Sequence, residues 1–258
     1  MTDAPVRVER AGPVAWCTMH RPPLNLLEPG SIQALRDAFL HLAADDELRA
    51  VVLTGAARAF CAGMDVRVLR DLDVRGARGL ITALHGAIEA VHHAPVPVVA
   101  AVNGPCLGAG LEIALACDLR LASTSATFGL PEVRVGVPSV IEAALLPPLV
   151  GPGRAAELLL TGEAVTAERA LAWGLVNHVV EGPSLRSAVD ALLAKILAAG
   201  PGAIRLQKGL MLRWRYSDLG TAIRDGIEAF SRAYTTGEPA EGAAAFLAKR
   251  APRFGGRS

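Results

Sequence analysis

The sequence lacks the usual marks of secreted, membrane-bound and nucleic-acid-binding proteins. It has only four cysteines, and none of them forms a CxxC pair. Cysteines scattered through apolar runs are typical of reduced core residues in a cytosolic protein. The net charge of the 258 residues is only +1, so the chain has no broad field to attract nucleic acid or a membrane surface.

Long apolar segments are missing as well. Residues 1–7 are polar and do not contain the apolar segment of a signal peptide. No apolar run reaches the roughly 20 residues that are needed to span a bilayer. We therefore expect a cytoplasmic protein without nucleic-acid or membrane partners. The length fits one large domain, or one domain with an appendage.

Several common cofactor and nucleophile motifs are also absent. The sequence contains no GxxxxGK[ST], no GxGxxG after a strand and no GxSxG. No group of His, Cys and Asp residues has the spacing of metal ligands. The sequence therefore predicts no metal site and no cofactor.

Strands and helices alternate along most of the chain. We predict buried strands in the apolar runs 14–20, 50–54, 96–102 and 117–122, with helices at 32–44 and 79–93 between them. The charged stretch 67–78 is predicted to be a mobile surface loop. Beyond residue 183 the pattern predicts helices alone, at 184–199, 203–215, 219–234 and 239–249. We therefore predict an α/β core over 1–199 and a helical region over 200–258.

Two turns rich in small residues follow predicted strands. One passes through Asn103-Gly104 and Gly108-Ala109-Gly110 into a helix that carries Glu112. Free N–H groups at a helix start favour negative charge, and glycine lets another molecule approach the backbone. The other turn spans residues 57–65, and a further glutamate, Glu132, follows a turn at 129–131. The alternative is a plain strand-to-helix turn with an acidic residue at the helix N-terminus.

Five segments in a fixed order resemble the crotonase (enoyl-CoA hydratase/isomerase) superfamily. They are FCAGMD (60–65), NGPCLGAGLE (103–112), CD (117–118), FGLPE (128–132) and LAWGLVN (171–177). The resemblance extends from about Arg21 to the C-terminus. It implies an α/β fold, a crotonase-like spiral of ββα units followed by a C-terminal all-helical trimerisation region. It also implies a homotrimer or a dimer of trimers.

The resemblance implies an enzyme that acts on an acyl-CoA substrate. The backbone N–H groups of Ala62 and Ala109 would form an oxyanion hole for the thioester oxygen. Glu112 and Glu132 match two glutamates that hold a water molecule in the hydratases. The implied activity is the addition of water across a trans-2-enoyl-CoA, with coenzyme A entering as part of the substrate. Alternatives are a Δ3,Δ2-enoyl-CoA isomerase, an acyl-CoA hydrolase or, in a different class, a CoA-ester- or RNA-binding protein with weak catalysis.

The resemblance also implies contacts for coenzyme A. Ala62, Met64 and Asp65 would lie beside the adenine, and Arg67 and Lys249 (or Arg253) are candidates for the phosphates. After Glu132 the sequence departs from the family, because residues 135–144 lack the glycine-rich run that hydratases commonly have. We expect Glu142, within this segment, to face solvent or to cap a neighbouring element.

Overall fold

A computed structural model describes residues 4–254 of the chain. Contacts divide the chain into two units, one of residues 1–94 and 98–189 and one of residues 95–97 and 190–258. The helix α8 (Leu185–Leu197) runs across this division; the sequence-based boundary after residue 199 stays a prediction. In the described part, no single helix could cross a membrane, although the bent pair 182–197 and 201–214 meets the length and composition criteria together.

The first unit is built on a six-stranded sheet. Its strand order is β1-β2-β3-β4-β6-β9, with the bounds β1 (Val6–Ala11), β2 (Val14–Met19), β3 (Ala50–Gly55), β4 (Val98–Val102), β6 (Leu119–Ser123) and β9 (His178–Val180). The β1–β2 hairpin is antiparallel, and every other neighbouring pair is parallel. All residues of β4 are buried, which is why its sequence is a continuous apolar run.

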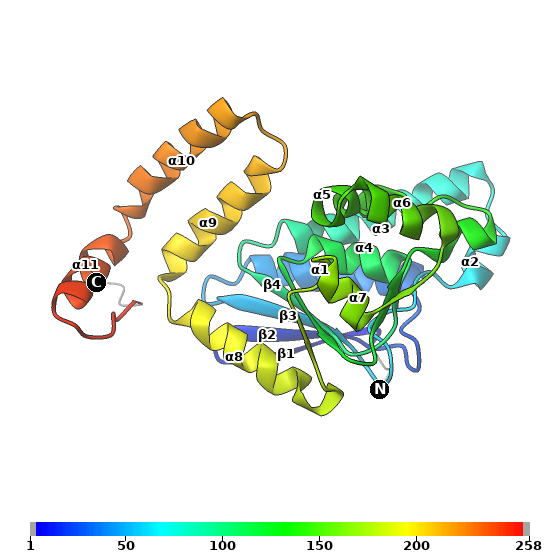
Figure 1. The fold of residues 1–258 in the computed structure, drawn as a ribbon, viewed down its shortest axis with the longest axis horizontal. Helices are drawn as coiled ribbons and strands as arrows, with labels where there is room; N and C mark the ends of the chain where they lie inside the picture. The colour runs from blue at the N-terminus through cyan, green and yellow to red at the C-terminus, as the bar shows by residue number, and fades with distance from the viewer. Residues whose placement is uncertain (1–3, 255–258) are drawn as a thin grey trace. The chain divides into compact units, whose positions relative to one another are not determined.

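Helices cover one side of the sheet. Figure 1 shows α1 (Pro29–Ala43), α3 (Val74–His92) and α4 (Ala109–Ala116) there. A second, three-stranded sheet has the order β5-β7-β8. Its strands and the remaining elements of this unit are β5 (Cys106–Leu107), β7 (Thr127–Gly129), β8 (Val165–Thr166), α2 (Val66–Arg70), η1 (Pro131–Val135), η2 (Ile141–Leu145), α5 (Leu146–Val150), α6 (Pro152–Thr161), α7 (Ala167–Ala172) and η3 (Gly182–Ser184). The structure is therefore of the expected α/β class.

The stretch 67–78 is helical, and the prediction of a loop there is wrong. It contains α2 and the first residues of α3. The Asp65 side chain caps α2 by accepting from the Arg67 N–H at 3.0 Å, and Asp73 caps α3 by accepting from the Gly76 N–H at 2.7 Å. Asp65, just before the stretch, and Asp73, within it, are thus the residues that start its helices.

After α8, the second unit contains three helices and no strand up to residue 254, the last that the structure describes. They are α9 (Pro201–Trp214), α10 (Leu219–Ala233) and α11 (Glu238–Leu247). Their bounds confirm the predicted run of helices without strands. The Glu238 carboxylate accepts from the N–H groups of Gly202 and Ala203, at 2.7 and 2.9 Å. A side chain of α11 therefore satisfies donors that the first turn of α9 leaves open.

Candidate active site

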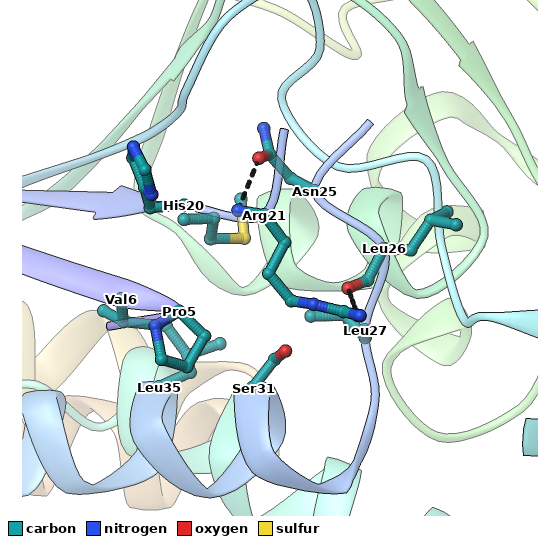
Figure 2. Close-up of a pocket in the computed structure, with 10 residues that line it drawn as sticks. Pro5, Val6, His20, Arg21, Asn25, Leu26, Leu27, Ser31 and Leu35 are labelled. Carbon is teal, nitrogen blue, oxygen red and sulfur yellow. Dashed lines mark hydrogen bonds between the residues drawn. The ribbon is translucent and has the colours of Figure 1, made fainter. Parts of the chain in front are cut away.

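A cavity of about 450 Å³ lies between α3, α4 and the segment that follows η1. Most of its lining is apolar; the polar side chains in it are Arg78, Glu112, Glu132 and Ser139. An apolar cavity of this size with a few convergent polar groups is typical of a small-molecule site. The cavity in Figure 2, beside Arg21 and Ser31, measures only about 10 Å³ and is too small for a substrate.

The two small-residue turns meet beside the larger cavity. The backbones of Cys61 and Cys106 pair in a single parallel β-bridge. The Leu107 N–H donates to the Cys61 carbonyl at 2.9 Å. A side chain at Gly110 would collide with that carbonyl, and one at Gly104 would collide with the backbone carbonyl of Arg58. The glycines of the turn at 103–110, the second along the chain, are therefore needed for close contact with the turn at 57–65, the first along the chain.

Two asparagines fix the first turn from both sides. The Asn25 amide donates to the carbonyls of Ala56 and Ala59 at 2.9 and 2.8 Å. The Asn103 amide donates to the Gly55 carbonyl at 2.9 Å. Figure 2 shows how Asn25 is held in turn, because its Oδ1 accepts from the Arg21 N–H at 3.0 Å. These bonds satisfy backbone groups of a loop that has no regular secondary structure.

One of the two backbone donors at the cavity differs from those expected. The Ala62 N–H donates to the Leu24 carbonyl at 3.0 Å, and Ala62 does not line the cavity. The expectation that Ala62 supplies an oxyanion donor is corrected on this ground. Met64 and Ala109 do line the cavity, and within residues 4–254 their N–H groups donate no hydrogen bond. The sequence could not show this, because the bond to Leu24 joins two distant loops.

Gly108 and Ala109 set the start of α4. Gly108 has φ +54° and ψ −130°, a combination that only glycine adopts readily, and Ala109 is the first helical residue. The Gly108 N–H donates to the Gly129 carbonyl at 2.9 Å, which ties the helix start to the strand before η1. As a result, the open N–H of Ala109 and the carboxyl of Glu132 belong to one cavity.

Glu112 lies on the first turn of α4 and is only 3% exposed. Burial, followed by the charges of Glu132 and Glu142, raises the pKa of its carboxyl from 4.5 to about 8. The backbone N–H groups of Ala143 and Val140 lower this pKa in part. At neutral pH the Glu112 carboxyl therefore holds a proton that it can deliver.

Glu132 is fixed by a residue that the sequence analysis did not identify. It lies on η1 and lines the cavity together with Glu112. The Ser139 hydroxyl donates to Glu132 Oε2 at 2.7 Å. Ser139 stands in the segment that departs from the family pattern, so comparison with the usual glycine-rich run gave no signal for it.

Glu142 neither faces solvent nor caps a neighbouring element, which corrects the expectation for this residue. It is 9% exposed, and its Oε1 lies 2.7 Å from Nδ1 of His85 on α3. Burial raises the pKa of the Glu142 carboxyl, and the contact with His85 lowers it in part. The pair spans 57 residues of sequence, and no local pattern indicates it.

The residues expected to bind coenzyme A are only partly brought together. Asp65 is 4% exposed, and its Oδ2 accepts from Arg67 at 2.6 Å. That guanidinium lowers the pKa of Asp65 to about 2. Arg67 therefore lies beside the first turn but already has a carboxylate partner. Lys249 belongs to the second unit, so its assignment stays a prediction.

No group of three or more His, Cys, Asp or Glu residues in the described part could hold a metal ion. The four cysteines are buried, and none forms a disulfide with another. Burial raises the pKa of the Cys61 thiol, which lies under the first turn, to about 12. The Cys61 thiol is therefore protonated, and all four cysteines lie in the core, as the sequence predicts.

Known proteins resemble this chain over almost its whole length. The sequence model of the family described as enoyl-CoA hydratase/isomerase matches residues 9–257. A short-chain-enoyl-CoA hydratase of Clostridium acetobutylicum is 35% identical over 248 residues, 95% of each chain. A crotonyl-CoA hydratase of Syntrophomonas wolfei is 33% identical over 96% of each chain. The crystal structure of an enoyl-CoA hydratase from Bacillus anthracis matches with a TM-score of 0.92 and 32% identity, covering 97% of this chain and 98% of that one.

Proposed function

Because the chain belongs to the enoyl-CoA hydratase/isomerase family, we propose that it hydrates a trans-2-enoyl-CoA thioester. The observation that carries this proposal is the presence of two glutamates, Glu112 and Glu132, in one apolar cavity with two open backbone N–H groups. Hydration needs both a proton donor and a proton acceptor at the double bond, and an isomerase can work through one base. The family membership confirms the resemblance to the crotonase superfamily, whose fold the chain shares.

The open N–H groups of Met64 and Ala109 would bind the thioester oxygen. Addition of water to the β-carbon moves negative charge onto this oxygen, and fixed donors stabilise that charge as it develops. Met64 takes the role that the sequence analysis gave to Ala62. Ala109 keeps its expected role, and its position at the start of α4 adds the positive end of the helix dipole.

The two carboxyl groups would complete the reaction on one water molecule. One carboxylate accepts a proton from the water as its oxygen attacks the β-carbon. The other carboxyl delivers its proton to the α-carbon, so the two hydrogens and the oxygen that are added equal one water. The pair must hold one proton before the reaction, and the raised pKa of Glu112, to about 8, provides it near neutral pH.

We propose further that coenzyme A enters as part of the substrate and that no other cofactor is needed. The short-chain and crotonyl names of the relatives make crotonyl-CoA the first substrate to test. The adenine would lie beside Met64 and Asp65, and Arg67 could meet a phosphate only by sharing its guanidinium with Asp65. The cytoplasmic location stays a prediction.

The test compares Glu112→Gln, Glu132→Gln and the double variant. Each amide keeps the volume of the side chain but can neither accept nor deliver the required proton. We expect each single variant to lose most hydration of crotonyl-CoA, and the double variant to be little worse, because the pair acts as a unit. Loss of the enoyl absorbance measures the rate.

The same variants separate hydration from isomerisation. In an isomerase that works through one base, Glu132→Gln would abolish proton transfer on a 3-enoyl-CoA while Glu112→Gln would leave it largely intact. Near-normal hydration by Glu112→Gln would overturn the two-glutamate mechanism and favour the isomerase.

A further inference from the structure

We propose that His85 and Glu142 form a positioning pair that holds the segment 139–143 against both cavity glutamates. This inference rests on the proposed function, because the glutamates it concerns are Glu112 and Glu132. Neither member of the pair lines the cavity. They would therefore act through the segment and would not touch the substrate.

The segment 139–143 contacts both glutamates within five residues. At its start, the Ser139 hydroxyl donates to Glu132 Oε2 at 2.7 Å. Val140 lines the cavity together with Glu112, and the backbone N–H groups of Val140 and Ala143 lower the pKa of the Glu112 carboxyl. A small movement of this segment would therefore move hydrogen-bond donors away from both carboxyl groups together.

The backbone of the segment is strained at its centre. Ile141 has φ +44°, a conformation that is rare and unfavourable for a β-branched residue. It lies between Val140, which faces Glu112, and Glu142, which faces His85. A strained turn persists only where its surroundings hold it in place, and the adjacent contact at 2.7 Å between His85 Nδ1 and Glu142 Oε1 does so.

The two carboxylate oxygens of Glu142 have different surroundings. Its Oε1 contacts His85, whereas its Oε2 is buried and has no hydrogen-bond partner among residues 4–254. The His85 side chain is 49% exposed, and that of Glu142 is 10% exposed. A buried carboxylate with one partner depends strongly on that partner, because an unpaired buried charge is unfavourable. His85 thus links the buried segment to the surface of α3.

The charged groups around the pair define its effect on pH dependence. Glu142 faces His85 and, more weakly, Glu89 of α3, and its charge also acts on Glu112 of α4. Glu132 of η1 acts on Glu112 as well. Removing the charge of Glu142 should therefore make the Glu112 carboxyl easier to ionise, while Glu132 and its bond from Ser139 stay in place.

The first experiment measures kcat, KM and the pH profile of kcat/KM for Glu142→Gln with crotonyl-CoA. The amide keeps an oxygen for His85 but loses the charge. We expect the alkaline limb of the profile to move to lower pH, with KM for crotonyl-CoA close to that of the parent protein. Glu47→Gln, the same substitution at an exposed site away from the pair and the cavity, is the matched control and should leave the profile unchanged.

The second experiment compares His85→Leu with His85→Asn. Leucine removes the contact to Glu142, and we expect kcat to fall by about ten- to a hundredfold because the carboxyl groups lose their alignment. The asparagine amide can occupy the place of Nδ1, so His85→Asn should recover most of the loss. Because His85 is half exposed, both variants are expected to fold, and circular dichroism checks this.

The results separate this inference from the proposed function. Suppose that Glu112→Gln and Glu132→Gln no longer hydrate crotonyl-CoA, but that Glu142→Gln and both His85 variants keep the kcat and pH profile of the parent. The positioning pair is then refuted, and the proposed function stands. A lower melting temperature with an unchanged pH profile and equal losses in His85→Leu and His85→Asn would also refute it. If the cavity glutamates themselves prove dispensable, the proposed function fails first.

Discussion

Gly108 and Glu132 lie against each other with no room for a single methyl group between them. A Cβ built on Gly108 would stand 2.5 Å from Glu132 Oε1, well inside ordinary contact distance. The close approach joins the start of α4 to η1, although the two residues come from different turns. It places the Glu132 carboxyl directly beside the residue that precedes the open N–H of Ala109.

This relationship predicts a strong effect of Gly108→Ala. The methyl would displace the Glu132 carboxylate, and the φ of +54° and ψ of −130° are unfavourable for alanine. We expect kcat for crotonyl-CoA to fall by roughly a hundredfold, since a displacement near 1 Å can cost that much. The free energy of unfolding should fall by about 1–3 kcal/mol, as measured by urea denaturation.

Gly86→Ala is the matched control for this substitution. Gly86 lies within α3, and a Cβ there would meet no other atom within 4 Å. Alanine in a helix interior is about 0.5–1 kcal/mol more favourable than glycine, so this variant should be slightly stabilised and fully active. Parent-like turnover in Gly108→Ala would show that Glu132 can move without loss of function.

Ala109→Pro tests the oxyanion donor on α4. Ala109 is the first residue of the helix, a position where proline is favoured because its missing N–H has no helical partner. The substitution should therefore remove the donor and leave the helix intact. We expect kcat to fall by roughly a hundred- to a thousandfold, with binding of coenzyme A retained in calorimetry. Turnover within a few-fold of the parent would place the donor elsewhere.

The raised pKa of Glu112 predicts a pH-dependent stability. A carboxyl whose pKa rises from 4.5 to about 8 on folding binds more protons in the folded than in the unfolded state between these values. The free energy of unfolding must therefore decrease as the pH rises through this window. In Glu112→Gln this decrease should be absent. Because each pKa unit corresponds to about 1.4 kcal/mol, the free energy of unfolding of the variant should exceed that of the parent by a few kcal/mol at the upper end of the pH window.

Urea denaturation at several pH values checks this prediction. Glu47→Gln, at an exposed position before β3, is the control and should follow the parent at every pH. If the difference between Glu112→Gln and the parent is constant across the window, Glu112 is not held neutral by its surroundings.

The parts of the fold that follow from local patterns were predictable from the sequence. Buried parallel strands such as β4 give continuous apolar runs, and the helices of the second unit show apolar residues at helical spacing. The helical stretch 67–78 was missed because Asp73 resembles a solvated charge and Asp65 was counted in the preceding turn. Their capping bonds to the N–H groups of Gly76 and Arg67 are known only from the structure.

At the site, motif residues were predictable and their partners were not. Glu112, Glu132 and Ala109 follow from the order of the motifs, and all three line the cavity. The hydrogen bond from the Ala62 N–H to the Leu24 carbonyl joins residues 38 positions apart in the sequence. The pair His85 and Glu142 joins residues 57 positions apart. Such contacts form only when the loops are brought together by the fold, so no short window of sequence contains them.

The second unit leaves a row of large apolar side chains exposed on α10. Ile223, Ile227 and Phe230 are 54%, 61% and 67% exposed, at spacings that place them on one side of the helix. Leu210 of α9, by contrast, is only 8% exposed. We propose that the α10 row packs against further copies of the chain in a trimer or a dimer of trimers.

A single substitution in this row tests the assembly. Burying glutamate in an apolar contact is unfavourable unless it is paired, so Ile227→Glu should lower the mass measured by light scattering from that of the assembly toward that of one chain of 26.8 kDa. Glu228→Gln, at the neighbouring exposed position, is the control and should keep the assembled mass. If the parent protein already has the mass of one chain at micromolar concentration, the α10 row is not an interface between copies and the proposed assembly is wrong.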